Sequence, residues 1–452
     1  MAESLHETFV SEVPGAVLDR AAIHLLDALA CAAGAIDAPP VAATRRSVAC
    51  SSPPEATIFF GGQRANVADA VLVNGTAVRY LDANDIFLGA GPGGHPSDNI
   101  PVAVNVAEQT GAAGRDVLAA IAVGYDLVAR IRRLIYRPSP RGGDWHEVSV
   151  SGVVSAAMTA LLHRAGVEQL ANAIAIGAAK GYALKEIRRG QLSMMKACAN
   201  ALVARDGITA ATLAMHGMAG PPEAFDGDSG LVRTFGAAPT EEMIESLCAP
   251  PEWAINRVSI KAYPALGTAQ AAIEAGVRIR RAHGAISAGL VDTIVVRLPD
   301  TRYTREYVHL AERRAPATRE SADHSIQFVV AVALLRGCVT PADFESECWT
   351  DADVRRLMER MRVEPDPSLD AHARTTFPTE VTVLTTDGRS VSMSVTSPSG
   401  SPDDPWGRHE VVAKFIELDR TGRSADAVDK IADATAGLAA ARDVSDLVAT
   451  LG

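Results

Sequence analysis

The segment from Asp82 to Asn99 carries a dense set of side chains that could do chemistry: DANDIFLGAGPGGHPSDN. It holds three acids, two asparagines and one histidine, with several glycines between them. Long apolar, alanine-rich stretches precede and follow it. A polar loop held between helices is typical of an active site, although a turn rich in Asx and Gly that only reverses the chain has the same composition. The segment by itself leaves both interpretations open.

Two of the chain's six lysines lie among apolar residues, Lys196 in SMMKACANAL and Lys261 in SIKAYPAL. A buried lysine is costly unless it is paired, and its pKa responds to its surroundings in a way that the pKa of arginine does not. The alternative is a surface lysine whose stem lies along apolar neighbours while its ammonium stays in water. We favour a functional role for both lysines.

Further polar residues stand in short segments elsewhere in the chain. They are Trp145-His146, Arg188 in RRGQLS, Tyr263 in KAYPA and Asp323-His324. Each segment is a weak signal alone, because an isolated histidine is more often a surface or core residue than a catalyst.

The elements that must position these residues are mostly helices. Apolar residues recur at three- and four-residue spacing, which predicts helices at 25–36, 66–80, 102–109, 117–134, 149–163, 170–178 and 194–215. Beyond about residue 260, β-branched runs at 292–298 and 380–384 predict strands. The turn signal Thr386-Asp387-Gly388-Arg389 then leads into a third strand at 390–396. Helices are expected at 324–336, 351–360 and 408–418.

This pattern predicts a mainly α protein with two domains. A chain of 452 residues is too long for one hydrophobic core. We expect a large all-helical domain formed by 1–264 plus 403–452, and an inserted, smaller α+β domain over 265–402.

Composition narrows the class of protein. The net charge of −11 argues against nucleic acid or an anionic membrane as a partner, but not against small anions in a local cationic pocket. The six cysteines are scattered without a CxxC pair, which argues against a disulfide framework, a zinc site or a cysteine-held iron–sulfur cluster. We expect no signal peptide and no membrane span, and hence a cytoplasmic protein.

The glycine-rich run at 89–94 invites comparison with a dinucleotide-binding loop. That loop needs a buried strand directly before it and a helix directly after it. Here an acidic segment precedes the run and His-Pro follows it, so we reject a nucleotide cofactor. P-loop, GxSxG and HExxH motifs are also absent from the sequence.

Taken together and in order, the polar segments resemble the MmgE/PrpD family. The matching motifs are HPSDN, GQLSMMKACA followed by AMHGMAGPPEAFDG, IKAYPA with Gln270, and ADHSIQFVVAVALL. The resemblance covers nearly the whole chain and is closest to the 2-methylcitrate dehydratase branch. The family also contains cis-aconitate decarboxylases and iminodisuccinate epimerases. The resemblance implies a helical domain with a smaller lid domain, a homodimer, a site between the domains, and no metal or organic cofactor.

The reactions of this family share one step, in which a proton moves at the carbon next to a carboxylate. Cations held on that carboxylate stabilise the charge that develops, and histidine is the natural proton carrier. We therefore expect His95, His146, Lys196 and Asp82 to be catalytic, one histidine accepting the α-proton and Asp82 orienting a cation. The expected residues for binding the substrate are Lys261, Arg188, Asn84, Ser97, Tyr263 and His324.

The expected activity is a cofactor-independent carbon–oxygen lyase that dehydrates a 2-methylcitrate-like acid. Decarboxylation of a cis-aconitate-type acid, or epimerisation or isomerisation through the same carbanion, uses the same residues and stays open. So does a non-catalytic protein that only binds carboxylates. Three positions depart from the family pattern: Ile86 replaces a usual threonine, Phe328 a usual tyrosine, and Leu266 makes the pocket segment more apolar. We interpret these as signs of a less polar substrate.

Overall fold

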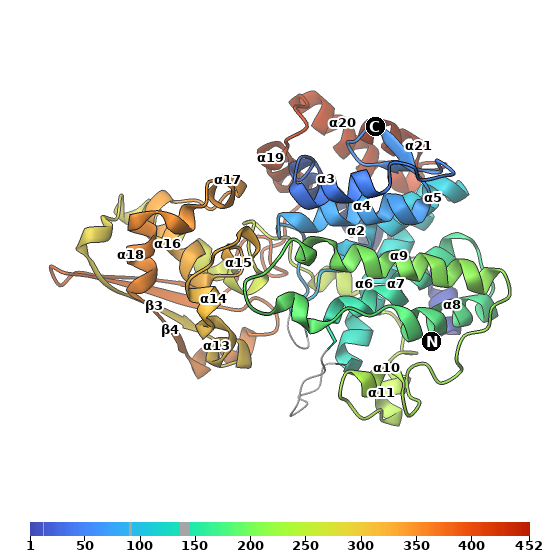
Figure 1. Ribbon diagram of the computed structural model, residues 1–452, viewed down its shortest axis with the longest axis horizontal. Helices are drawn as coiled ribbons and strands as arrows, with labels where there is room; N and C mark the ends of the chain where they lie inside the picture. The colour runs from blue at the N-terminus through green and yellow to red at the C-terminus, as the bar shows by residue number, and fades with distance from the viewer. Residues whose placement is uncertain (12, 90–92, 136–144) are drawn as a thin grey trace.

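The computed structural model describes residues 1–11, 13–89, 93–135 and 145–452, and for Glu147 the backbone alone. It is a mainly α protein with a small sheet, as the sequence predicts. Figure 1 shows a large group of helices on one side and the four-stranded sheet with its own helices on the other. Among the described residues, no single helix is both long and apolar enough to cross a membrane.

The larger group consists mainly of helices from the first half of the chain. They are α1 (Ala2–Val10), α2 (Gly15–Gly34), α3 (Pro39–Ser47), α4 (Val67–Tyr80), α5 (Ile100–Thr110), α6 (Gly114–Ile135), α7 (Val150–Leu162), α8 (Val167–Lys180), α9 (Met195–Met215), α10 (Leu231–Thr234) and α11 (Glu241–Glu245). From the end of the chain α19 (Arg408–Leu418), α20 (Ala425–Ala436) and α21 (Ser445–Leu451) join them, and α19 packs on α2.

Helix α4 shows how the local sequence sets an element that matters for function. Asn66 caps it, its side chain accepting a hydrogen bond from the backbone N–H of Asp69, which satisfies one of the free amides at the helix start. The helix ends just before Asp82, whose φ of 54° lies in the left-handed region. A non-glycine residue is strained there and must be held by its surroundings.

Close helix contacts among α7, α8 and α9 depend on glycine. A Cβ at Gly207 of α9 would lie 2.5 Å from the carbonyl oxygen of Gly152 in α7 and closer still to the hydroxyl of Ser155. Alanine and glycine therefore let these helices approach nearly backbone to backbone. The start of α9, where Lys196 lies, is fixed by this packing.

One detail of the all-helical prediction is wrong. A short antiparallel pair, β1 (Ala56–Ile58) with β2 (Gln63–Ala65), lies among the helices and packs on α4 and α5. Strands of three residues are too short to produce a readable alternation of apolar and polar residues.

The second group contains the four-stranded sheet in the order β4-β3-β5-β6. Its strands are β3 (Val291–Leu298), β4 (Met361–Pro365), β5 (Thr379–Thr385) and β6 (Ser390–Val395). β3 pairs in parallel with β4 and antiparallel with β5, and β5 pairs antiparallel with β6 across the predicted turn. The sequence pattern does not predict β4, because two of the five residues in MRVEP are charged.

The helices of this group precede β3 or lie between β3 and β4 in the sequence. They are α12 (Gln270–His283), α13 (Arg302–Arg305), α14 (Ala311–Arg314), α15 (Arg319–Ala322), α16 (Ile326–Arg336), α17 (Pro341–Glu345) and α18 (Ala352–Glu359). α12 contacts β5 and β6 and packs on α16.

Buried apolar side chains form two clusters. The first draws on residues 5–260 and 411–451, and the second on 265–395 together with Ile86 and Leu88. The two clusters follow the change of pattern seen in the sequence. An independently moving lid domain with the expected boundaries stays a prediction.

Candidate active site

Asp82 lies at the centre of a buried group of charged side chains. We call this group the Asp82 cluster; it comprises Arg79, Asp82, Lys196, Lys261, Asp323 and His324. The guanidinium of Arg79, one turn earlier in α4, lies 3.0 Å from the Asp82 carboxylate and helps to hold its strained backbone. Burial alone would raise the pKa of the Asp82 carboxyl. The nearby cations outweigh burial and hold that pKa well below its usual range; they are Arg79, Lys196 and Lys261. Asp82 is therefore a carboxylate anion that forms ion pairs with several cations.

Lys196 connects the two groups of elements. It lies in the first turn of α9, and its Nζ is 2.9 Å from Asp82 Oδ2 and 2.5 Å from Asp323 Oδ2. Burial lowers the pKa of this lysine to about 8, and the nearby cations Arg79 and Arg188 lower it as well. Its ammonium can therefore lose a proton close to neutral pH, which an exposed lysine does not do.

Lys261 reaches the same carboxylate from the opposite segment of chain. Its ammonium forms an ion pair with Asp82 Oδ1 and donates to the backbone oxygen of Asp82 over 2.6 Å. The segments align because Ile86 and Ser259 exchange backbone hydrogen bonds, with N···O distances of 2.8 and 2.9 Å. Burial lowers the pKa of Lys261, and the Asp82 contact opposes that shift.

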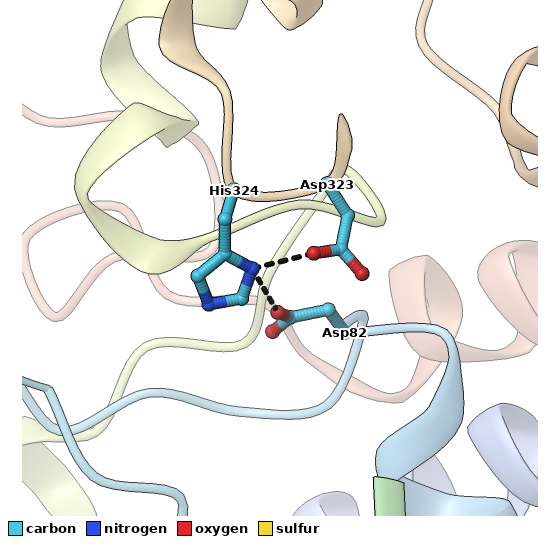
Figure 2. Close-up of side chains that lie close together, drawn as sticks. All are labelled: Asp82, Asp323 and His324. Atoms are coloured by element: carbon cyan, nitrogen blue, oxygen red, sulfur yellow. Dashed lines mark hydrogen bonds and ion pairs between the residues drawn. The ribbon is translucent and has the colours of Figure 1, made fainter. Parts of the chain in front are cut away.

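Asp323 and His324 bring the second group of elements into the cluster, as Figure 2 shows. They lie between α15 and α16, where the Ser325 side chain caps α16. The His324 Nδ1 is 2.5 Å from Asp323 Oδ1 and 3.4 Å from Asp82 Oδ2. Two carboxylates at Nδ1 mean that this nitrogen carries a proton, so a neutral ring has its lone pair on Nε2.

His95 has a defined tautomer. Its Nδ1 is 2.6 Å from the backbone oxygen of Asp85, an acceptor, so Nδ1 must carry the proton and Nε2 the lone pair. Burial, with Arg79 and Lys261 nearby, holds the pKa of His95 well below its usual range. A histidine with this tautomer and a low pKa is neutral and ready to accept a proton at Nε2.

Asn84 and Ser97 are fully buried and brace this loop. The amide of Asn84 donates to Ser97 Oγ over 3.0 Å and to Asp98 Oδ1 over 2.8 Å. Ser97 in turn donates to Asp85 Oδ1 over 2.6 Å. Their observed contacts hold the segment that carries His95; a direct contact with substrate stays a prediction.

His146 and Arg188 lie together beside His95. Arg188 Nε–H donates to His146 Nε2 over 2.8 Å, and Arg188 Nη1 is 3.3 Å from His324 Nε2. His95, His146 and Arg188 line one small cavity together with Asp98 and Gly94. Arg188 Nε–H can only donate, so His146 Nε2 is the acceptor of this contact.

Tyr263 lies with α12 rather than in the Asp82 cluster. Its backbone pairs with the side chain of Gln270, its ring packs on the second apolar cluster, and its charged neighbours are Glu274 and Arg278. Burial raises the pKa of Tyr263 to about 12. The structure therefore brings together nine of the ten predicted residues and leaves Tyr263 beside Gln270 of α12.

The buried charged residues that the sequence did not single out as site residues include Arg79, Asp98, Asp323 and Lys414. Asp98 and Asp323 stand inside the motifs HPSDN and ADHS, so their position was a signal that could have been used. Lys414 had the signal that identified Lys196 and Lys261, a rare lysine in an apolar run. Arg79 had no comparable signal, because arginine is common in this chain.

The side chains of the three substituted positions are buried in the second apolar cluster, although the backbone N–H of Leu266 donates to the backbone oxygen of Asp323. Phe328 is fully buried in the second apolar cluster, edge-on to Phe344 and Trp349. Ile86 and Leu266 are buried in the same cluster, and a Cβ at Gly267 would lie 2.6 Å from Ile86. The inference of a less polar substrate from Phe328 is therefore wrong, because the missing hydroxyl would point into an apolar core.

Asp82, Asp323 and His324 also have the donor types of a metal site, and their ligand atoms lie within 4.8 Å of one another. The chemistry of the group favours a different cation, because the Lys196 ammonium already contacts both carboxylates. A divalent ion between them would meet that ammonium at close range. The Lys196 ammonium is the counter-ion that both carboxylates contact.

Comparison with known proteins identifies the family. The sequence model of the MmgE/PrpD N-terminal domain matches residues 1–243, and that of the C-terminal domain matches residues 263–438. The chain is 27% identical to cis-aconitate decarboxylase of Mus musculus over 71% of its own length and 65% of the relative's. It is 28% identical to 2-methylcitrate dehydratase of Cupriavidus necator over 70% and 66% of the two chains. A fungal alkylcitrate dehydratase, phiI, is 26% identical over 88% and 82%.

The matches to the mouse and human decarboxylases span 65% and 61% of those proteins. The family models together cover most of the chain, including the segments that supply Asp82, Lys196 and Asp323, while Lys261 lies between the two matched ranges. This chain therefore belongs to the MmgE/PrpD family.

Proposed function

We propose that this protein is a lyase that dehydrates a citrate-like hydroxy acid without a metal or organic cofactor. The observation that carries the proposal is the pairing of a cationic cluster with a neutral histidine whose free nitrogen is Nε2. Lys196, Lys261 and Arg188 supply positive charge for carboxylates, and His95 supplies the base. Relatives named 2-methylcitrate dehydratase and alkylcitrate dehydratase support this reaction class.

The first step is removal of the proton next to a substrate carboxylate. His95 Nε2 takes the proton, the C–H electron pair moves toward that carboxylate, and negative charge develops on its oxygens. Cations stabilise that charge more strongly in the transition state than in the ground state, and burial increases the effect. Arg188 can hold a carboxylate through two parallel N–H groups once it releases His146.

The second step is loss of the hydroxyl group. The electron pair returns to form the C=C bond, the C–O bond breaks, and the departing oxygen takes a proton and leaves as water. Lys196 is a suitable donor because its pKa of about 8 lies close to neutral pH. His146 is the alternative donor, once it has itself been protonated.

A specific observation also supports decarboxylation as a second candidate function. Relatives from mouse and human are named cis-aconitate decarboxylase and match at 27% and 28% identity. The same cations would stabilise the carbanion left by loss of CO2, and a protonated His95 would return a proton to it. Epimerisation or isomerisation would use the carbanion in the same way.

The wider expectations belong to this proposal. The partner is a small carboxylic acid rather than nucleic acid or membrane, in keeping with the net charge of −11. The protein acts in the cytoplasm as a homodimer, and the second group of elements, which supplies Asp323 and His324, closes over the acid as a lid.

The test is to mix the EDTA-treated protein separately with 2-methylcitrate, citrate and cis-aconitate, following ultraviolet absorbance and the NMR spectrum of the products. A new conjugated alkene from a hydroxy acid is the expected result. Loss of cis-aconitate with release of CO2 would instead establish the decarboxylase. Binding without turnover of all three acids would contradict catalysis and indicate a carboxylate-binding protein.

A further inference from the structure

Lys414 is a buried cation that the proposed chemistry does not use. It lies in α19, near the end of the chain, and is only 6% exposed. Its ammonium has three N–H groups and three acceptors: Asp27 Oδ1 at 2.5 Å, the backbone oxygen of Ala83 at 2.7 Å and the backbone oxygen of Lys261 at 3.0 Å. Every donor is therefore satisfied, which is the condition for burying an ammonium.

The two backbone acceptors belong to the segments that carry the active-site charges. Ala83 directly follows Asp82, and the other carbonyl is that of Lys261 itself. These segments are already joined by the backbone hydrogen bonds between Ile86 and Ser259. Lys414 adds a connection from a helix 153 residues beyond Lys261 in the sequence.

The charge of Lys414 is maintained by a buried partner. Asp27, in α2, is fully buried and forms an ion pair with it. Burial opposes the charged form of Lys414, but Asp27 outweighs it and raises the pKa of the lysine above its usual value. The planar guanidinium of an arginine does not reproduce the three directions of an ammonium.

We propose that Lys414 is a positioning residue that sets the register of the Asp82 and Lys261 segments, so that helix α19 is part of the catalytic framework. Its catalytic consequence rests on the proposed function; its structural consequence does not. Without Lys414, two buried carbonyls and one buried carboxylate lose their donor, and the Lys261 ammonium loses its fixed position against Asp82.

The experiment compares Lys414→Met with Lys430→Met, which removes an exposed lysine from the neighbouring helix α20. Hydrogen exchange of the Ile86 and Ser259 amides, which form the backbone pair between the two segments, reports their register. In Lys414→Met we expect these two amides to exchange about tenfold faster or more, while amides in the middle of α9 keep their wild-type rates. Lys430→Met should leave all of them unchanged.

Turnover gives the second readout. We expect Lys414→Met to lower kcat about tenfold or more with a smaller change in KM, because the misplaced Lys261 stabilises the transition state less. If Lys414 acts through Lys261, the variant carrying both Lys414→Met and Lys261→Met should lose no more activity than Lys261→Met alone.

Unchanged exchange at Ile86 and Ser259 would overturn the proposal, and so would an equal increase over the whole molecule, which would indicate general destabilisation. If the wild type converts none of the three acids, the proposed function fails while the exchange data still decide the role of Lys414. Should Lys414→Met fail to fold, Lys414→Gln retains two amide donors, and the same comparison of amides applies.

Discussion

At the scale of single residues, protonation states set the chemistry. The contact of His95 Nδ1 with the Asp85 carbonyl leaves Nε2 as the acceptor, and no feature of the HPSDN motif alone selects that nitrogen. Burial lowers the pKa of Lys196, but the carboxylates of Asp82 and Asp323 favour its charged form and oppose that shift. In the proposed mechanism, the environment of His95 and Lys196 therefore assigns one as proton acceptor and the other as proton donor.

His95→Ala should lower kcat by about 10²- to 10⁴-fold, the usual contribution of a general base, without unfolding the protein. The loss follows from removal of the Nε2 acceptor. Steady-state kinetics with circular dichroism on the same sample would measure it. His216→Ala, which removes an exposed histidine at the end of α9, is the matched control and should keep its activity. A His95→Ala protein with the wild-type rate would remove His95 from the mechanism.

The pH dependence of kcat should follow the same two groups. The pKa of His95 is held well below 6.5, so the base stays neutral and active through pH 6 to 7. Lys196 must be protonated to donate, so activity should fall as the pH rises through about 8, where its ammonium loses the proton. A pH–rate profile from 5 to 10 checks both statements. Lys196→Arg should remove the fall near pH 8 together with most of the activity, since arginine stays charged.

At the scale of elements, close packing of helices determines where Lys196 lies. The backbone contacts of α9 with α7 leave no room for a methyl group at Gly207. Helix α4 is similarly close to α9, since a Cβ at Gly75 would lie 2.9 Å from the side chain of Ala201. The alanine and glycine content of these helices is therefore a requirement of the site, because the charged cluster forms between their ends.

Gly207→Ala should lower stability by about 1–3 kcal/mol, the usual cost of overpacking. The added methyl group would overlap the side chain of Ser155 and the carbonyl of Gly152. Thermal unfolding of the variant against the wild type measures the effect. Gly15→Ala is the control: it starts α2, has no atom within 4 Å of the added Cβ, and should unfold at the wild-type temperature or slightly above it. Equal midpoints for both variants would show that α7 and α9 can separate at little cost.

At the scale of the whole molecule, the candidate active site lies where the two groups of elements meet. Asp82, Lys196 and Lys261 come from the larger group, whereas Asp323 and His324 come from the segment next to α16. The Lys196 ammonium contacts Asp82 from the larger group and Asp323 from the second group, so it forms ion pairs with both groups of elements. The net charge of −11 is a sum over the whole chain and is compatible with a local group of buried cations.

Removal of metal ions should leave the activity unchanged. Since Arg79, Lys196 and Lys261 already form ion pairs with Asp82, and Lys196 also with Asp323, we expect these carboxylates to need no divalent ion. Turnover should be equal before and after dialysis against EDTA, and added Mg²⁺ or Zn²⁺ should not raise it. A loss of activity that a metal ion restores would show that Asp82, Asp323 and His324 act as ligands.

The amino-acid sequence alone determined the helix periodicity, the strands β3, β5 and β6 with their turn, and most of the residues of the site. Regular spacing and rare residue types are local properties, so they can be read without coordinates. The tertiary structure decided which of these residues meet, because contacts between distant segments depend on packing. In the folded chain Arg79, Asp323 and Lys414 join the charges around Asp82. Tyr263 lies beside α12 instead, and Phe328 is buried in the apolar core. The tertiary structure also determined the lone-pair nitrogen of His95, because in the folded chain the backbone carbonyl of Asp85 accepts from Nδ1 and leaves the lone pair on Nε2.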